Sequence, residues 1–246
     1  MSSIYDERYA GNYRESLNAQ ELARWGALEH FITRVAKIGS ARRVLDYGAG
    51  IGLHVDLWEE VFPGAELHFT DISSVAMQKF KTSYPRHADR YVLDAHALPD
   101  ASFDAIVSVE VMEHVEDLDA YVRDVRRLLA PGGTFAWTTP CANALSVEHV
   151  YSTVTGRVDA TDEGYRRWRW EDPTHLRRLK TREIESFLRD RGFTHVEFRL
   201  RSHVFSFVCT YFPVRRLRPA LGSLVGLDYA LFRRLPNGAS MIGAAR

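Results

Sequence analysis

The chain has 246 residues, of which 46% are hydrophobic and 26% charged, a composition that allows one large globular domain with a full core. Its first residues are polar and aromatic, and no window approaches about 18 consecutive apolar residues, so we expect neither a secretory signal nor a membrane span, and a cytoplasmic location. The formal net charge is zero, but residues 151–246 carry 18 Lys and Arg against 10 Asp and Glu, which fits either an anionic ligand or solvated helix faces.

The N-terminal part of the chain predicts helices. Between residues 18 and 38, apolar side chains recur at the three- and four-residue spacing of an amphipathic helix, namely Leu22, Trp25, Leu28, Phe31, Ile32 and Val35. Further upstream, Tyr5, Tyr9 and Tyr13 recur every fourth residue, which would place them on one face of a helix.

From residue 43 the chain alternates between predicted strands and predicted helices. The strands are expected at 43–47, 67–70, 91–93, 103–109 and 134–138. The helices between them are expected up to Phe62, at 75–83 and at 118–129, with a Pro131-Gly-Gly133 turn before the fifth strand. This alternation predicts an α/β fold with a doubly wound, mostly parallel Rossmann-like sheet covered by helices on both faces.

After Thr139 the pattern loosens until about residue 174, and we expect this stretch over the active-site end of the sheet. A helix at 181–191, a strand at 194–200 and a last strand at 239–244 would complete a seven-stranded sheet. The long excursion 202–238 predicts helices packed over the sheet or a homodimer contact, while an acceptor lid or a membrane-surface patch stays open as an alternative.

The turn after the first strand carries the most specific signal. Gly48, Gly50 and Gly52, with Ala49 between them, allow a tight turn and let a ligand approach backbone that a Cβ would block. Asp46, two positions before the first glycine, suits a ligand with an ammonium or sulfonium group and repels a pyrophosphate, which disfavours a nicotinamide dinucleotide. This D-x-G-x-G-x-G pattern resembles the first motif of class I S-adenosylmethionine-dependent methyltransferases, and the chain is similar to their type 11/12-like small-molecule members.

Two later acidic residues stand where the resemblance implies cofactor contacts. Asp71, followed by Ile72, closes the second strand 19 residues beyond Gly52, where a carboxylate can accept both ribose hydroxyls. In the resembling family the position of Asp94 faces the adenine amino group, and the backbone of Ala95 meets the ring. An N-cap role for Asp71 and a simple turn role for Asp94 are the alternatives.

The order of the motifs extends the resemblance over residues 43–139, because 103–110 and 128–133 look like the fourth- and fifth-strand motifs of the same family. The resemblance implies S-adenosylmethionine as the cofactor and a single methyltransferase domain. Its parts would be a helical cap at 1–40, a cofactor-binding core at 41–139 and acceptor-side segments at 140–246. The Tyr5-Asp-Glu-Arg-Tyr9 opening resembles a segment that closes over cofactor and acceptor, with packing against the core as the alternative.

Candidate catalytic groups lie in Glu110-Val-Met-Glu-His114, at the end of the fourth strand, where open α/β sheets bind ligands. If the chain turns helical from Glu110, this residue, Glu113 and His114 share one side, with Glu110 also beside the cofactor. Carboxylates and an imidazole in that arrangement are ligands for a divalent metal.

The E-x-x-E-H arrangement resembles that of ubiquinone-pathway O-methyltransferases and of small-RNA terminal 2′-O-methyltransferases, and His175 has a place like a further histidine of the RNA enzymes. Three interpretations stay open. A metal is held by Glu110, Glu113, His114 and His175, or His114 or His175 acts as a metal-free general base, or both histidines are structural.

Cations and aromatic residues alternate in Tyr165-Arg-Arg-Trp-Arg-Trp170. Together with Arg177, Arg178 and Lys180, this segment predicts a cradle for a phosphate, a nucleotide sugar or stacked bases, so we expect Arg167 and Arg169 to face the acceptor. The balanced total charge and the lack of a recognisable RNA-binding module argue against nucleic acid as the partner. The two cysteines, Cys141 and Cys209, have no CxxC spacing and argue against a thiolate metal site.

The sequence therefore predicts a methyltransferase that acts on the hydroxyl or amine of a small or lipid-linked metabolite, which the basic second half allows to be anionic. The alternatives are a metal-assisted RNA 2′-O-methyltransferase and a non-catalytic protein that binds S-adenosylmethionine.

Overall fold

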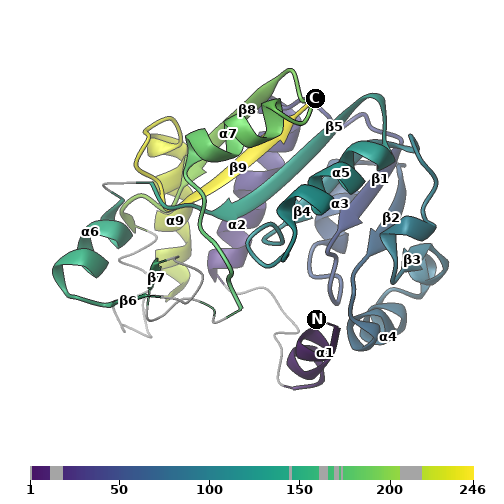
Figure 1. Ribbon diagram of the computed structural model, residues 1–246, viewed down its shortest axis with the longest axis horizontal. Coiled ribbons are helices and arrows are strands. Elements are labelled where there is room, and N and C mark those ends of the chain that lie inside the picture. Colours follow the sequence, from purple (N-terminus) through teal and green to yellow (C-terminus); the bar gives the residue numbers. More distant parts are fainter. Residues whose placement is uncertain are drawn as a thin grey trace.

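A seven-stranded sheet forms the centre of the protein (Figure 1). The computed structural model describes residues 2–11, 19–143, 146–160, 166–168, 172, 174–205 and 218–246. The strands of the sheet are β1 (Arg43–Tyr47), β2 (Glu66–Thr70), β3 (Tyr91–Val92), β4 (Phe103–Val109), β5 (Leu129–Pro140), β8 (Val196–Arg201) and β9 (Ser240–Ala245). Their order across the sheet is β3-β2-β1-β4-β5-β9-β8.

The carboxyl ends of β1–β5 and of β8 lie at the same edge of the sheet. All neighbours from β3 to β5 pair in parallel, whereas β9 is antiparallel to both β5 and β8. Strand β8 therefore runs in the same direction as β5, and its last residue, Arg201, lies at the carboxyl edge. The predicted seven-stranded, mostly parallel sheet is confirmed. The strand order reverses between β1 and β4, which is the switch point where such sheets form a ligand crevice.

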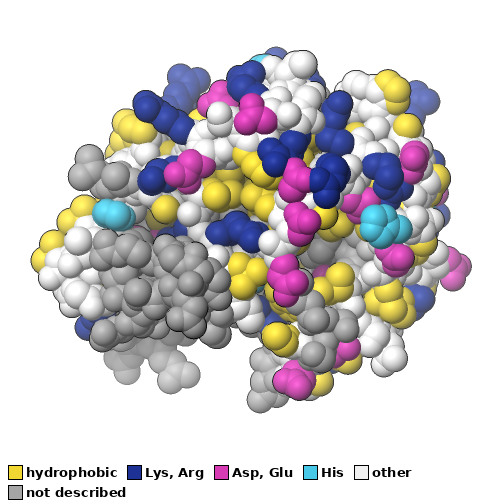
Figure 2. Space-filling model, viewed as in Figure 1, with side chains coloured by type: hydrophobic (Ala, Val, Ile, Leu, Met, Phe, Trp, Pro, Cys, Tyr) yellow, Lys and Arg dark blue, Asp and Glu magenta, His cyan; other side chains and the backbone are white. Residues whose placement is uncertain are grey.

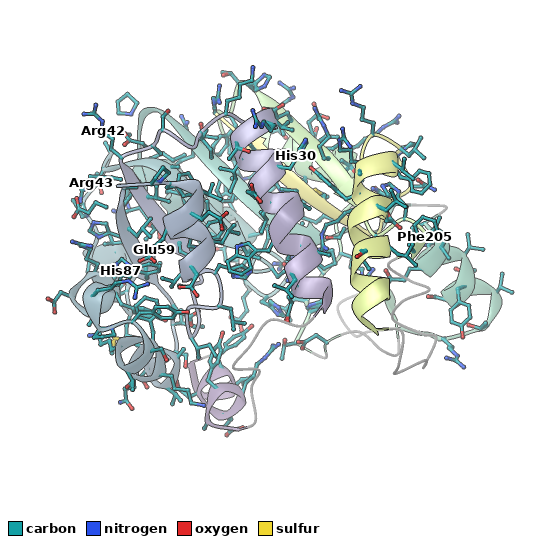
Figure 3. The ribbon with its side chains drawn as sticks, turned by 180° about the vertical axis from the view of Figure 1, so that it is seen from behind. His30, Arg42, Arg43, Glu59, His87 and Phe205 are labelled. Carbon is teal, nitrogen blue, oxygen red and sulfur yellow. The ribbon has the colours of Figure 1, made fainter. Side chains whose placement is uncertain are left out.

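Helices cover both faces of the sheet, as the alternation of elements predicts. On one face lie α2 (Ala19–His30) with its π-helical extension η1 (Phe31–Val35), α3 (Val55–Val61), α4 (Ser74–Ser83) and α9 (Arg218–Phe232). On the other face lie α5 (Leu118–Leu128) and α7 (Thr181–Arg189). Seen from behind, α2 and α9 run side by side, with His30 directed toward α9, where its Nδ1 lies 3.2 Å from the Tyr229 hydroxyl (Figure 3).

The two faces carry separate apolar clusters. Phe31, Trp58 and Phe80 belong to the cluster under α2 and α3, and all three are fully buried. Phe135 and Trp137 of β5 belong to the cluster under α5 and α7, where their rings stack at 5.1 Å. Burial of both sheet faces explains why the strands read as apolar runs rather than as alternating patterns.

Three segments differ from the sequence-based expectation or add to it. Strand β5 already begins at Leu129, so Pro131-Gly-Gly133 forms an irregularity inside the strand instead of a separate turn. The register shows this, because Phe103 faces Leu129 whereas Ala105 faces Thr134. The loose stretch after Thr139 contains α6 (Val147–Val154) and an antiparallel pair, β6 (Val158–Ala160) with β7 (Arg166–Trp168). Helix α9 lies in the second half of the excursion 202–238.

The N-terminal helix α1 (Ser2–Ala10) lies apart from the two helical layers, at the carboxyl edge of the sheet and beside α4 (Figure 1). Along the described ranges, no helix combines the length and the apolar character that crossing a bilayer would need.

Substituting Gly243 tests the packing between β5 and β9. A Cβ at Gly243 would lie 2.2 Å from Cζ2 of Trp137, a ring that is 1% exposed and cannot move aside. We expect Gly243→Ala to lower the free energy of unfolding by about 1–3 kcal/mol through overpacking. Urea unfolding measures the effect. The control is Gly226→Ala in α9, where nothing lies within 4 Å and helix propensity predicts a gain of about 0.5–1 kcal/mol. Equal losses in both variants would contradict the described packing.

Candidate functional site

The glycine turn after β1 is tied to the end of β2. Gly48 and Gly52 have φ angles of +86° and +90°, a left-handed backbone that favours glycine. The carbonyl oxygen of Thr70, the last residue of β2, accepts hydrogen bonds from the backbone N–H groups of Gly48 (2.8 Å) and Ala49 (2.9 Å). The turn thus has a defined position at the switch point of the sheet.

Close packing explains why the flanking glycines have no side chain. A Cβ at Gly48 would lie 2.3 Å from Cγ2 of Val111, and a Cβ at Gly52 would lie 2.8 Å from the rings of Phe80 and Tyr84. Gly50 differs, because the group nearest to its missing Cβ is the Tyr9 hydroxyl of α1, at 2.6 Å. The middle glycine therefore faces the helix that covers the turn rather than the core.

Asp71 follows β2 and bridges two backbone segments. Its Oδ2 accepts from Gly50 N at 2.9 Å, and its Oδ1 accepts from Ser73 N at 3.0 Å. Burial raises the pKa of this carboxyl group. The N-cap of α4 is Ser73, whose Oγ accepts from Ala76 N at 3.1 Å, so the cap role that the sequence left open for Asp71 is taken by Ser73.

Asp94 and its neighbours lie at the end of β3. The Asp94 Oδ1 accepts from His96 N at 2.8 Å and caps the short 3-10 helix η3 (Ala95–Ala97), so it has the turn role that the sequence offered as an alternative. Ala95 is half-buried, and its carbonyl accepts from Arg127 at 3.0 Å. Two large apolar side chains are exposed beside the acids, Ile72 at 48% and Leu93 at 38%. Sequence reasoning did not include Leu93 among the candidate site residues. The signal that could have found it is its place directly before Asp94 at the end of the strand.

Asp46 is enclosed instead of lying open in the crevice. It is 3% exposed, and its Oδ2 accepts from the indole Nε1 of Trp58 in α3 at 2.7 Å. Burial raises the pKa of Asp46 to about 7, with the charge of Asp71 adding to the effect. The carboxyl group of Asp46 is therefore directed to Trp58 in the protein interior, which does not favour the expected contact with a cationic group of the cofactor.

The expected helical turn from Glu110 is wrong. Glu110 has a φ of +56°, and the next helix, α5, begins only at Leu118. The left-handed backbone sends its carboxylate to Thr138 of β5, whose hydroxyl donates to Oε1 at 2.8 Å, and to Arg24 of α2, 3.4 Å from Oε2. Although burial acts in the opposite direction, the charges of Arg24 and Arg201 lower the pKa of Glu110 to about 2. Glu110 is thus not grouped with the other predicted metal ligands, and its side chain is an ionised carboxylate beside Thr138 and Arg24.

Glu113, His114 and His175 come together, with one possible ligand atom from each lying within 4.8 Å of the others. Glu113 is 1% exposed, and its Oε2 accepts from the Thr139 hydroxyl at 3.1 Å while its Oε1 has no hydrogen-bond partner. That side chain stands 4.0 Å from Nε2 of His175. The His114 Nδ1 lies 3.1 Å from the Thr174 carbonyl oxygen, an arrangement that directs Nε2 into the cluster.

The protonation of this cluster follows from its burial. Burial, together with the nearby charge of Glu110, raises the pKa of Glu113 well above its usual range. Burial and the neighbouring His175 lower the pKa of His114 to about 4. His114 is therefore a neutral imidazole at pH 7, suited to accept a proton weakly or to coordinate an ion.

Helix α1 covers the glycine turn. Its Asp6 Oδ1 accepts from the Ser73 hydroxyl at 2.6 Å and from Val75 N at 3.2 Å, which fastens the helix to the start of α4. Tyr9, which is 9% exposed, reaches Gly50 as described above.

The same helix also contacts the histidine cluster. The ring of Tyr5 meets that of His114 edge-on at 6.1 Å. Arg8 donates to Asp172 at 2.7 Å and to the Thr174 hydroxyl at 3.1 Å. One short helix thus touches both the glycine turn and the segment that carries His175. Tyr13, the third tyrosine of the predicted stripe, lies outside the described residues.

The basic residues after 174 do not form the expected cradle. Arg177 donates to the carbonyl oxygens of Met112, Val115 and Glu116, so its guanidinium fixes the turn that follows β4. Arg178 pairs with Glu148 at 3.1 Å, and Lys180 pairs with Glu183 at 3.2 Å. The side chains of 165–170, including Arg167 and Arg169, lie outside the described residues. On the face shown in Figure 2, positive and negative side chains of the described residues are interspersed.

Two arginines, Arg201 buried and Arg24 half-buried, were missed by the sequence reasoning. Arg201 ends β8 and is 8% exposed, and Arg24 lies in α2 with its Nε buried and without a hydrogen-bond partner. The signal for Arg24 was its spacing, because it shares a helix face with the apolar Leu28 and Phe31. For Arg201 the signal was an arginine at the end of a strand that joins a buried sheet.

Comparison with known proteins gives a consistent result. Residues 17–197 match a family described as "Methyltransferase domain". A probable S-adenosylmethionine-dependent methyltransferase of Mycolicibacterium smegmatis is 30% identical over 161 residues, which cover 65% of this chain and 55% of the relative. A malonyl-[acyl-carrier protein] O-methyltransferase of Methylococcus capsulatus is 34% identical over 167 residues, covering 65% and 54%. The chain thus spans about half the length of these curated relatives.

Solved structures share the fold. A methyltransferase from Archaeoglobus fulgidus, described as dependent on S-adenosylmethionine, superposes with a TM-score of 0.57 at 18% identity over 99% of this chain and 98% of that chain.

The buried Asp46 predicts a pH dependence of stability. The pKa of Asp46 is about 7 in the folded protein, against about 3.9 for an exposed aspartate in the unfolded chain. Between these values the folded state holds a proton that the unfolded state has released, so the contribution of Asp46 to stability is lost as the pH rises through this window. Asp46→Asn keeps an acceptor for Trp58. At pH 8 its free energy of unfolding should exceed that of the parent by on the order of 2–4 kcal/mol, and this difference should shrink toward pH 4.

Urea unfolding of the ligand-free protein at several pH values measures this gap. The exposed Asp89 provides the control, since Asp89→Asn should follow the parent at every pH. A constant difference between parent and Asp46→Asn from pH 4 to 8 would contradict the buried, proton-holding Asp46.

Proposed function

Since the chain belongs to the methyltransferase domain family, we propose that it binds S-adenosylmethionine at the ends of β1, β2 and β3 and transfers the methyl group to a small or lipid-linked acceptor. The observation that carries the proposal is the contact between the glycine turn and the acid of β2, where the Asp71 carboxylate meets Gly50 N at 2.9 Å beside the switch point of the sheet.

Each part of the cofactor has a matching group at this edge. The amino-acid part would lie along Gly48–Gly52, where the backbone can be approached closely. The Asp71 carboxylate would accept the ribose hydroxyls, since each of its oxygens has a second lone pair beyond its present hydrogen bond. The exposed Ile72 and Leu93 would enclose the adenine ring, with Asp94 and Ala95 at its edge. Burial of these two apolar side chains would add to the affinity.

Methyl transfer requires an acceptor atom aligned with the methyl carbon and shielded from water. The acceptor oxygen or nitrogen attacks the methyl carbon, the bond from that carbon to sulfur breaks, S-adenosylhomocysteine leaves, and the acceptor releases a proton. Helix α1 would provide the shielding, because Tyr9 covers the glycine turn while Tyr5 stands against His114. We assign the proton step to the Glu113–His114–His175 cluster, which lies on the acceptor side of that turn.

A divalent cation fits this cluster. Glu113 offers a buried Oε1 without a hydrogen-bond partner, Thr174 orients His114, and one ligand atom of His175 lies within 4.8 Å of theirs. Three such ligands would leave a further coordination position of the cation for an acceptor oxygen. A bound Mg²⁺, Mn²⁺ or Zn²⁺ would lower the pKa of an acceptor hydroxyl, so no strong protein base would be needed. Without a metal, His114 or His175 would take the proton as a general base.

Small acceptors are favoured over RNA. The relative from Methylococcus capsulatus is named for a malonyl-[acyl-carrier protein] substrate, an O-methylation of a small acyl group. The second candidate is a protein that binds S-adenosylmethionine without transferring its methyl group, because both kinds of protein need the same cofactor-binding residues.

S-adenosylhomocysteine should bind and stabilise the fold, by roughly 1.4 kcal/mol at a tenfold excess over Kd. Asp71→Ala should weaken this binding by about 1–3 kcal/mol through the loss of charge-assisted hydrogen bonds to the ribose. Calorimetry measures both effects. Asp89→Ala, at an exposed position of the same part of the chain, should bind like the parent. Parent-like affinity in Asp71→Ala would remove Asp71 from the site.

Mn²⁺ should bind to the purified protein and be detected by calorimetry and elemental analysis. Glu113→Gln, His114→Ala and His175→Ala should each lower Mn²⁺ affinity at least tenfold while leaving S-adenosylhomocysteine affinity unchanged. His195→Ala is the control, because this histidine has a side chain that is 63% exposed and lies outside the cluster. Mn²⁺ affinity that is equal in parent and cluster variants would leave the histidines as bases or structural groups.

A further inference from the structure

Arg201 is a buried cation with few partners. Its backbone ends β8 at the carboxyl edge of the sheet, and only 8% of the residue is exposed. The Nε donates to the Ser240 hydroxyl at 3.1 Å. Across the described ranges, its two terminal nitrogens have no hydrogen bond, and no carboxylate oxygen lies within 4 Å of them. A guanidinium has five N–H donors, so the terminal N–H groups of Arg201 could donate to a ligand.

Arg24 approaches the same place from helix α2. One of its terminal nitrogens stands 3.4 Å from Glu110 Oε2, and its Nε is buried without a hydrogen-bond partner. Glu110 interacts electrostatically with both Arg24 and Arg201, which in turn repel each other. Two guanidinium groups therefore share the field of one carboxylate.

Two carboxylates, those of Glu110 and the buried Asp228, act electrostatically on Arg201. Glu110 is already engaged by Thr138 and Arg24, and Asp228 accepts from the backbone N–H groups of residues 203–205. Among the described residues, neither acid forms an ion pair with Arg201. Burying an unpaired charge costs several kcal/mol. Such a cost is tolerated where a ligand supplies the missing charge, and paired arginines match the planar, bidentate geometry of carboxylate and phosphate groups.

The position of Arg201 favours the acceptor over the cofactor as the source of that anion. Strands β5 and β9 separate β8 from β4, so Arg201 belongs to the opposite half of the sheet from the glycine turn on β1. Hydrogen bonds join Arg201 to the Glu113–His114–His175 cluster. Ser240, which accepts from Arg201 Nε, donates to the Thr139 carbonyl oxygen at 3.4 Å, and the Thr139 hydroxyl donates to Glu113 at 3.1 Å.

We propose that Arg24 and Arg201 together bind an anionic group of the acceptor, a carboxylate or a phosphate, and so hold the acceptor atom beside Glu113, His114 and His175. This inference rests on the proposed methyl transfer only in assigning the anion to the acceptor. It replaces the predicted cradle of Arg177, Arg178 and Lys180, whose side chains are committed to carbonyl oxygens and to glutamates.

Titration of inorganic phosphate and of acetate into the complex with S-adenosylhomocysteine tests the proposal. Calorimetry should detect binding of at least one anion to the parent protein, and Arg201→Met and Arg24→Met should each weaken it at least tenfold. Tighter phosphate binding would indicate a phosphorylated acceptor, and tighter acetate binding a carboxylic acid. Arg201→Lys keeps the positive charge but loses the paired N–H donors of the guanidinium, so its affinity for the anion should lie between those of the parent and Arg201→Met.

Arg199→Met is the matched control. Arg199 lies on the same strand and the same sheet face, two residues before Arg201, and its guanidinium donates to the Phe198 carbonyl at 2.8 Å. This variant should bind both anions like the parent. A second readout separates binding from a structural role, because Arg201→Met should leave the melting temperature of the ligand-free protein unchanged or raised.

Three results would overturn the proposal. These are the absence of anion binding to the parent, anion affinity that is equal in parent and Arg201→Met, and a lower melting temperature of Arg201→Met without any effect on anion binding. A fourth is weakened S-adenosylhomocysteine binding in both arginine variants with unchanged binding of methylthioadenosine, which lacks the carboxylate, since the anion would then belong to the cofactor. If the parent fails to bind S-adenosylhomocysteine but still binds anions at the arginines, the proposed function fails instead.

Discussion

The left-handed backbone at Glu110 is the constraint on which the acceptor side of this protein depends. It ends β4 abruptly and directs one carboxylate toward Arg24 and Thr138, while the following turn carries Glu113 and His114 in another direction. A non-glycine residue in this region is strained, and such strain persists only where surrounding contacts hold it. Here the hydrogen bonds from Glu110 N to both Thr138 oxygens provide that hold. Glu110 therefore lies beside the arginines, whereas Glu113 lies beside His114 and His175.

Helix α1 makes the two halves of the site depend on each other. It is fastened through Asp6 to the start of α4, which follows Asp71, and through Arg8 to Asp172, which precedes His175. Although burial raises the pKa of Asp172, hydrogen bonds from the hydroxyl and the backbone N–H of Thr174, together with the charge of Arg8, lower it to about 2, so this carboxylate is charged at neutral pH.

The site is built from groups whose burial costs stability. Asp46 holds its proton near pH 7, Glu113 retains one above its usual range, and Arg201 has a pKa lowered to about 10 by burial and by Arg24. Replacing buried charged groups by apolar side chains of similar size is often neutral or stabilising for a protein. Their common location at the carboxyl edge of one sheet is typical of functional sites, where perturbed pKa values cluster. Cofactor and acceptor would offset these costs when they bind.

The sequence by itself determined the order of strands and helices, the mostly parallel sheet and the glycine turn with Asp71, because periodicity, glycine turns and strand-end acids act over a few residues. Only the tertiary structure decided which side chains meet. A single left-handed residue moved Glu110 out of the expected ligand set, and the reversal of β9 brought Arg201 to the carboxyl edge, within the field of Arg24. Such contacts arise from packing between elements far apart in the chain, which no local spacing encodes.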